Sequence, residues 1–326
     1  GLRQARGIIE CRNAQLINGI DGRHVWAERF TFGAGDVYAV QAGIVGRIAG
    51  TLFSGIRASE TSASLRKPPA SLDVYELTLR GAAHERQQTR DSMIAGRAEL
   101  ERATELDPLY APARVWLGYL IAGDAVSTLS GRVGIADLPE AIAQIRRGIA
   151  LDPTLALGYQ ALSYALSYTD DLDESLVAAE RAVELAPGDS DNLNFLSRAQ
   201  LIVGQYEVAL ASVEQAIALN PLMPALYLMQ RARVLYALGR FSEASRDANV
   251  SAPAFPSVRL VRLIGAAADI ARGAPEQAKA WIAPLLQRDP DFNLGSPVLA
   301  PFFKRDPARR QRLLDHLRAA GVPDQT

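Results

Sequence analysis

Apolar residues recur at spacings of three and four along most of the chain, a pattern typical of amphipathic helices. Short turns interrupt this pattern at regular intervals, and the prolines of three such turns, Pro153, Pro187 and Pro221, recur every 34 residues. A proline pushes the residue before it out of the helical region, so each of these turns ends a helix. The spacing therefore predicts helix pairs that repeat along the chain over residues 72–290.

A 34-residue period with two helices per unit is typical of tetratricopeptide arrays. Matching small residues such as Ala182 and Ala216 let paired helices approach closely, while large apolar residues fill the space between pairs. The first two units end at Pro108 and Pro153, and the longer interval between them predicts a long loop over residues 123–139. The fifth unit is one residue longer than the others. The predicted fold is all-α, a solenoid of about six helix hairpins.

The two ends of the chain follow other patterns. Residues 8–30 read as a β-hairpin, residues 36–52 as an amphipathic helix, and residues 57–71 as a polar linker with a Pro-Pro pair. Gln41 and Arg47 argue against a membrane span in this region, because a charge is costly in hydrocarbon. Residues 1–56 are therefore expected to be a small unit of a β-hairpin and a helix. At the other end, residues 291–326 are predicted to cap the array.

The cap prediction depends on one amphipathic segment. Asp306 is suited to the N-cap of a helix, Pro307 to its first turn, and Gly321 to its end. Leu313, Leu314 and Leu317 of this segment provide an apolar face that can cover the last hairpin. A terminal cap of this kind is needed because an open repeat end exposes apolar surface.

Composition narrows the classes of function. The hydrophobic fraction of 48% permits real cores, and the formal net charge of −1 argues against a dedicated nucleic-acid-binding protein. The single cysteine, Cys11, excludes an intrachain disulfide and agrees with a reducing compartment, so we expect a cytoplasmic location. The chain begins with Gly1, and we expect it to be a piece of something longer.

Few residues form patterns that indicate chemistry. His24, His84 and His316 lie far apart without ligand spacing, so no metal site is expected from them. The acidic residues 170–174 lack the glycine and distal glutamate of a calcium loop, and we expect them to cap a helix. The basic residues 309–312 are expected to form a solvated face, with an acidic partner as the alternative. No catalytic, cofactor-binding or metal-binding residues are predicted.

The first helices of successive hairpins line the concave face of a tetratricopeptide array, and this face is the one candidate site. Arginine and asparagine side chains there can bind a peptide carboxylate or backbone, and tyrosine adds apolar area. The alternative is that the same side chains only pack on neighbouring repeats or are solvated. The repeat register predicts these groove residues: Gln160, Tyr164, Asn194, Arg198, Met229, Arg233 and Tyr236.

Four segments of the chain resemble a known bacterial layout. Residues 13–17 and 22–30 are similar to the closing hairpin of the TolB-like domain, and residues 36–41 to the helix after it. Residues 71–81 resemble the start of the first repeat in that layout, and residues 306–323 resemble its ending. Ala42 and Gly43 depart from the acidic pair found there, which leaves any role of those acids in doubt.

This resemblance implies that residues 1–56 are a partial TolB-like segment, a small remnant of an α/β domain. It also implies that the chain is a carboxy-terminal region that follows an output module. The best-known proteins with this layout are class III adenylate or guanylate cyclases and winged-helix transcriptional regulators. The cyclase carboxylates themselves do not occur in this segment. We therefore expect a non-catalytic scaffold that binds a protein, a peptide or another domain of its own chain. The alternatives are the carboxy-terminal part of a cyclase enzyme, part of a transcriptional regulator, or a scaffold that self-associates through its sixth hairpin.

Overall fold

The computed structural model describes residues 2–5, 8–17, 24–33, 73–220, 224–256 and 258–324. Strands β1 (Leu2–Ala5), β2 (Ile8–Ile17) and β3 (His24–Gly33) form an antiparallel sheet in chain order. The return strand β3 thus ends three residues beyond the predicted hairpin. The predicted helix 36–52 and linker 57–71 lie outside the described residues. No helix within the described ranges is both long and apolar enough to cross a membrane.

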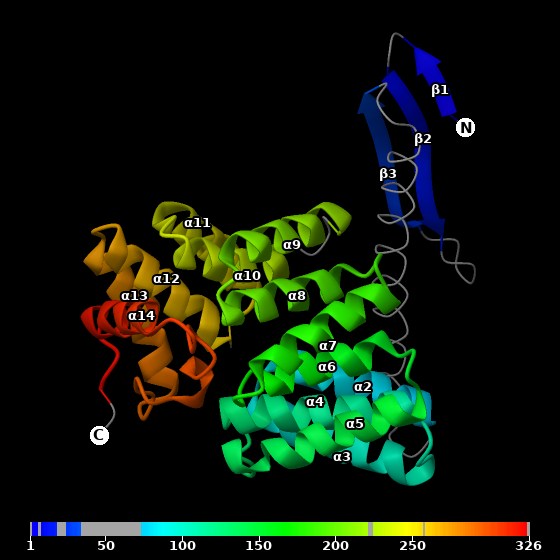
Figure 1. The fold of residues 1–326 in the computed structure, drawn as a ribbon, viewed down its shortest axis with the longest axis horizontal. Helices are drawn as coiled ribbons and strands as arrows, with labels where there is room; N and C mark the ends of the chain where they lie inside the picture. Colours follow the sequence, from blue (N-terminus) through cyan, green and yellow to red (C-terminus); the bar gives the residue numbers. More distant parts are fainter. Residues whose placement is uncertain are drawn as a thin grey trace.

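The rest of the described chain is helical, and successive helices pair as antiparallel hairpins (Figure 1). Six hairpins follow one another, as the repeat period predicts, and α14 comes after them. In chain order the helices are α2 (Val74–Gln87), α3 (Arg90–Leu106), α4 (Ala111–Ser127), α5 (Leu138–Leu151), α6 (Ala156–Leu166), α7 (Leu172–Leu185), α8 (Ser190–Val203), α9 (Tyr206–Leu219), α10 (Pro224–Ala237), α11 (Phe241–Ser251), α12 (Arg259–Ala271), α13 (Pro275–Arg288) and α14 (Pro307–Ala319).

The second helix of five hairpins ends with the same backbone geometry. Asp107, Asp152, Ala186, Asn220 and Asp289 each have φ between −135° and −143° and ψ between 74° and 95°. A proline follows each of these residues, and its ring excludes the helical conformation from the residue before it. The proline spacing therefore marks the ends of these helices, as the sequence predicts.

Glycine ends the first helix of three later hairpins and also allows close helix packing. Gly204, Gly239 and Gly273 have φ of +92°, +77° and +81°, a left-handed conformation that glycine adopts without a Cβ clash. Inside the second hairpin, a Cβ placed on Gly118 would lie 2.6 Å from the carbonyl oxygen of Ala141. The helices α4 and α5 are thus in contact at a spacing that only glycine permits.

The extra residues of the second hairpin are only partly a loop. Residues 123–127 extend α4, so the connection begins at Thr128 and not at Gly123 as predicted, and it includes the short helix η2 (Ile135–Asp137). The buried Asp124 carboxylate explains the longer helix, because its Oδ1 accepts a hydrogen bond from the Ser130 backbone 2.9 Å away. The Ser130 hydroxyl donates to the same carboxylate. These bonds attach the connection to the last turn of α4.

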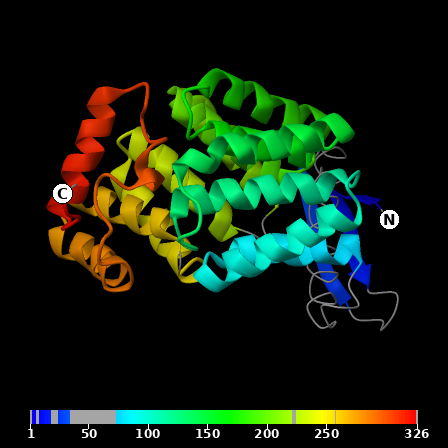
Figure 2. The ribbon, with the colours of Figure 1, turned by 90° about the horizontal axis from the view of Figure 1, so that it is seen from below.

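The C-terminal helix packs against the sixth hairpin. Helix α14 packs on α12 (Figure 2). Its Leu313 and Leu317 are fully buried. The Asp306 carboxylate accepts a hydrogen bond from the backbone N–H of Arg309 at 2.9 Å, which satisfies one free donor at the helix start. The segment before α14 contains the short helix η4 (Pro297–Leu299) and folds back toward the concave face.

Candidate functional site

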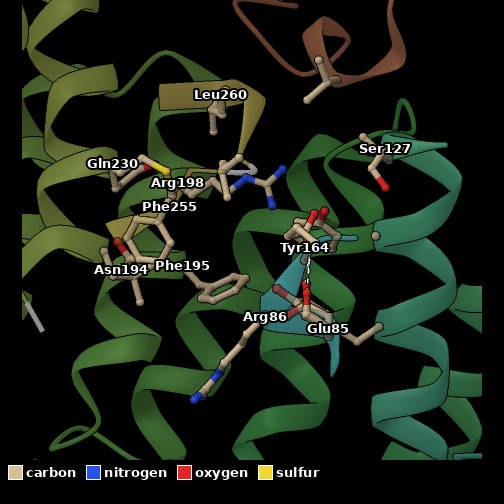
Figure 3. A pocket seen from close by; sticks show the side chains of 18 of the residues that line it. Glu85, Arg86, Ser127, Tyr164, Asn194, Phe195, Arg198, Gln230, Phe255 and Leu260 are labelled. Atoms are coloured by element: carbon tan, nitrogen blue, oxygen red, sulfur yellow. Dashed lines mark hydrogen bonds between the residues drawn. The ribbon is translucent and has the colours of Figure 1, made fainter. Parts of the chain in front are cut away.

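The first helices of the hairpins enclose a cavity of about 320 Å³. Helices α4, α6, α8 and α10 provide most of its wall, and the end of α2 and the start of α12 complete it (Figure 3). Val298, Pro301 and Phe302 from the segment before α14 also line it. Its volume is within the range of about 300–1,000 Å³ that is usual for small-molecule sites.

Six of the seven predicted groove residues line this cavity: Gln160, Tyr164, Asn194, Arg198, Met229 and Arg233. Tyr236 does not. It is 0% exposed, and its hydroxyl forms a hydrogen bond with Nδ1 of His316 on α14 at 2.8 Å. Tyr236 corresponds in the repeat to Leu201, which is also buried, so its position on the helix faces the core. Whether the six lining residues bind a partner stays a prediction.

Arg198 lies against two tyrosine rings inside the cavity. The guanidinium carbon is 4.4 Å from the centre of the Tyr164 ring and 5.2 Å from that of Tyr168. Its Nη2 donates to the Ser167 hydroxyl at 3.0 Å, while its Nη1 is buried without a hydrogen-bond partner in the described chain. The cation–π contacts hold the cation in place, but they leave one donor free.

Arg233 is a buried cation without a carboxylate partner in the described chain. Its side chain is 4% exposed, and its Nη1 donates to Oε1 of Gln230 at 2.7 Å. The guanidinium carbon lies 4.8 Å from the Phe302 ring centre, and Nε has no partner among the described residues. Burial and the positive charge of Arg198 lower the pKa of Arg233 to about 9. The burial of this positive charge therefore costs free energy.

Aromatic side chains form the apolar part of the wall. The rings of Tyr119 and Tyr164 are 4.8 Å apart, and Phe195 lies 6.3 Å and 6.4 Å from them. Burial raises the pKa of both tyrosines, so their hydroxyls stay protonated near neutral pH. Figure 3 shows Glu85, Tyr164, Phe195 and Arg198 around the same space. The wall thus combines flat apolar surfaces with cationic groups.

Glu85 lies at the end of the cavity formed by α2. Burial raises the pKa of its carboxyl group to about 7, and this effect exceeds the opposing attraction of Arg86 and the hydrogen bond from Gln88. The Gln88 Nε2 donates to Oε1 of Glu85 at 3.0 Å. Arg86 lines the cavity and is exposed, so the cavity reaches the surface beside the end of α2.

Contacts between distant parts of the chain close the cavity. Nη1 of Arg259, at the start of α12, donates to the carbonyl oxygen of Ser127, at the end of α4, at 2.8 Å. In addition, Lys304 Nζ lies 3.1 Å from Asp170 Oδ1, and Arg305 forms two hydrogen bonds with Asp173. These links join residues more than 130 positions apart. The array therefore closes on itself around the cavity.

These links also correct two predictions. The acidic residues 170–174 make no side-chain cap bond to α7, and instead Asp170 and Asp173 bind the segment before α14. The basic residues 309–312 are not simply solvated. Arg309 binds Asp306 and stacks 4.4 Å from the Tyr206 ring centre, and Arg310 donates to backbone carbonyls of the segment that precedes it. In both cases, contacts with segments outside the helix replace the expected pattern.

The described residues contain no group of three or more histidine, cysteine, aspartate or glutamate side chains placed to hold a metal ion. His84 lies 3.5 Å from Glu99, between α2 and α3, and His316 packs between Tyr236 and Phe241. Both histidines thus pack between helices, away from the cavity. Three lining residues were not predicted: Tyr119, Arg259 and Phe302. The predicted residues come from the third to fifth hairpins, whereas these three lie in the second hairpin, in the sixth hairpin and after it.

The sequence is similar to a known protein over half of its length. No family model matches the chain. A protein of Rhizobium meliloti (strain 1021) named "Putative adenylate cyclase 3" is 30% identical over 163 residues, which is 50% of this chain and 28% of that protein. The chain therefore spans less than a third of the length of this curated relative.

Solved structures show similar helical architecture. The human IFIT1 dimer with m7Gppp-AAAA has a TM-score of 0.57 at 15% identity, covering 78% of this chain and 60% of that chain. The APC/C hetero-tetramer Cut9-Hcn1 has a TM-score of 0.56 at 14% identity, covering 83% and 48%. A thermophilic tetratricopeptide protein from Thermus thermophilus has a TM-score of 0.46 at 20% identity, covering 55% and 92%. At these identities the likeness concerns the fold alone. The 34-residue period and the six consecutive helix hairpins define a tetratricopeptide-like protein.

Proposed function

We propose that this chain is the non-catalytic interaction region of a larger signalling protein whose output module is a nucleotide cyclase. The observation that carries the proposal is the six-hairpin tetratricopeptide-like array, an architecture that typically mediates protein–protein interaction. The similarity to the Rhizobium relative supports the choice of a cyclase as the output. The partner is then a protein, or another domain of the same parent chain.

The described residues support a binding role more than a catalytic one. Among the lining residues, the Ser127 hydroxyl has no hydrogen-bond partner in the described chain, so it is not paired with either lining carboxylate, Glu85 or Asp191. The lining contains arginine, amide and aromatic side chains, which recognise ligands through hydrogen bonds and apolar contact. Such a wall is suited to binding and orienting a ligand.

Self-association through the sixth hairpin has little support in the fold. Helix α14 and the segment before it cover the apolar face of α12, and Leu263 and Ile264 are fully buried there. A second copy would have to displace the cap to reach this surface. We therefore favour a partner other than a second copy of the chain.

The coding sequence upstream of Gly1 provides the first test. A catalytic cyclase domain is expected there, and a winged-helix domain would favour a transcriptional regulator instead. The second test compares the parent protein with a version that lacks residues 73–326 and measures the formation of cyclic nucleotide. We expect the shortened protein to keep catalysis but to change its regulated activity several-fold. Complete loss of catalysis in a folded protein, or no change at all, would contradict the proposed role.

A further inference from the structure

The cavity contains an unusual concentration of unsatisfied polar atoms. Four of its lining side chains have a buried nitrogen or oxygen atom without a hydrogen-bond partner in the described chain: Ser127, Asn194, Arg198 and Arg233. A buried polar group without a partner costs about 1–3 kcal/mol, and more when it is charged. Native proteins rarely keep such groups unless a ligand, an ion or water satisfies them. Their position around one cavity indicates that the missing partner binds there.

The charged groups around the cavity indicate whether the missing partner is an anion or a cation. Arg198 and Arg233 form no ion pair with any described residue, and each lowers the cost of an anion placed between them. The two lining carboxylates are elsewhere: Glu85 is bound to Gln88, and Asp191 accepts a hydrogen bond from the Tyr227 hydroxyl at 2.9 Å. An anion near the two guanidinium groups would meet two free donors and no competing carboxylate.

The shape of the cavity defines the rest of the ligand. Tyr164 and Phe195 provide flat apolar walls, and Phe302 closes the side next to Arg233. The link from Arg259 to Ser127 and the segment before α14 both lie at the concave face, and the cavity there has a volume of only about 320 Å³. A compact molecule fits a volume of this size better than an extended chain of residues.

We propose that the cavity binds a small organic anion, with its carboxylate or phosphate group between Arg198 and Arg233 and a flat apolar body against the aromatic wall. This role goes beyond the interaction with a protein partner. Because the ligand would contact both the central hairpins and Phe302, it would stabilise the closed array. A small metabolite would thereby control how much of the protein presents the closed array to a partner or to an attached output domain.

The test uses the whole chain and four probes with the same ring system: 2-naphthoate, 2-naphthyl phosphate, neutral 2-naphthamide and cationic 2-naphthylmethylamine. Binding is measured by calorimetry and by the thermal midpoint. At 100 times the dissociation constant, a binding anion should raise the midpoint by about 4 °C. The carboxylate and phosphate arms separate the two possible head groups. Equal affinity for the amide, or binding of the amine alone, would overturn the proposal.

Variants separate a ligand-binding role from a structural one. Arg198→Met and Arg233→Met each remove a charged donor and should weaken anion binding by about 10- to 100-fold. Arg233→Met also removes an uncompensated buried charge, so the empty protein should keep or raise its thermal midpoint. The matched control is Arg240→Met, at an exposed arginine paired with Glu243, which should leave anion affinity unchanged.

The outcomes against the proposal are equally specific. If Arg233→Met lowers the thermal midpoint and leaves anion affinity intact, Arg233 has only a structural role. If Arg198→Met and Arg240→Met weaken binding equally, the anion binds nonspecifically to surface charge. A tetrapeptide, acetyl-Ala-Ala-Ala-Phe with a free carboxylate, completes the series. Binding of this peptide without binding of either naphthyl anion would replace the small-molecule site with a peptide-end site.

Discussion

Replacing Gly118 with alanine tests the contact between the two helices of a hairpin. The new methyl group would lie 2.6 Å from the backbone oxygen of Ala141 and 2.7 Å from Cγ1 of Ile145. A rotation of a side chain can move Ile145, but the backbone oxygen moves only if α5 shifts as a whole. Overpacking of this kind costs about 1–3 kcal/mol. The substitution should therefore destabilise the second hairpin.

The same helix offers a matched control. A Cβ on Gly123 would meet its nearest neighbour, Oε1 of Glu85, at 3.8 Å, which is an ordinary contact. Both substitutions gain about 1 kcal/mol of helix propensity, because alanine replaces glycine inside α4. This gain cancels in the comparison. The unfolding free energies of Gly118→Ala and Gly123→Ala should thus differ by about 1–3 kcal/mol, with Gly123→Ala the more stable.

Urea unfolding followed by circular dichroism measures this difference, and thermal unfolding provides a second readout. A difference of about 1–3 kcal/mol corresponds to roughly 1–5 °C in the thermal midpoint for a chain of this size. Equal stability of the two variants would refute the close contact of α4 and α5. So would a Gly118→Ala protein that is more stable than the unsubstituted chain.

Two further predictions concern buried carboxyl groups. Burial raises the pKa of Glu85 to about 7, so the folded state favours the protonated form, and stability from this group is lost as the pH rises through 7. Urea unfolding should show that the unfolding free energy falls by at most about 3 kcal/mol between pH 5 and pH 8, and Glu85→Gln should abolish this fall. The same pH dependence in the variant would contradict the role of Glu85. Asp269 is buried and accepts hydrogen bonds from Ser245, Arg272 and Trp281 at 2.6–2.8 Å. Asp269→Ala should cost about 3–5 kcal/mol in the same assay, and a loss below about 1 kcal/mol would show that these bonds contribute little.

The sequence predicts the repeats well because their signals are local. A proline after a helix and a glycine at a helix end act within a few residues, so Pro153 and Gly204 mark boundaries without tertiary information. The extension of α4 was missed for the opposite reason. It depends on the Asp124 carboxylate binding Ser130, a contact that helix propensity and turn composition do not reveal.

The candidate site was also predicted only in part, because some of its residues follow the repeat register and others do not. The repeat register placed Arg198 and Arg233 on the concave face, since equivalent helices present equivalent positions. It misplaced Tyr236 by extending the register one turn beyond the lining residues, where the helix faces the core. Phe302 and the closing contacts lie outside the repeat pattern. They form only when the C-terminal segment meets hairpins more than 100 residues earlier in the chain.

The closure of the array around the cavity is the central claim, and zero-length cross-linking tests it most directly. The chain has three lysines, Lys67, Lys279 and Lys304. A carbodiimide joins amino and carboxyl groups that are already in contact, and Lys304 lies 3.1 Å from Asp170, with Lys279 2.8 Å from Glu276 as the local control. Mass spectrometry of the monomeric product should find Lys304 joined to Asp170. A product that contains the Lys279–Glu276 link but no link from Lys304 to this acidic turn would contradict the closed array.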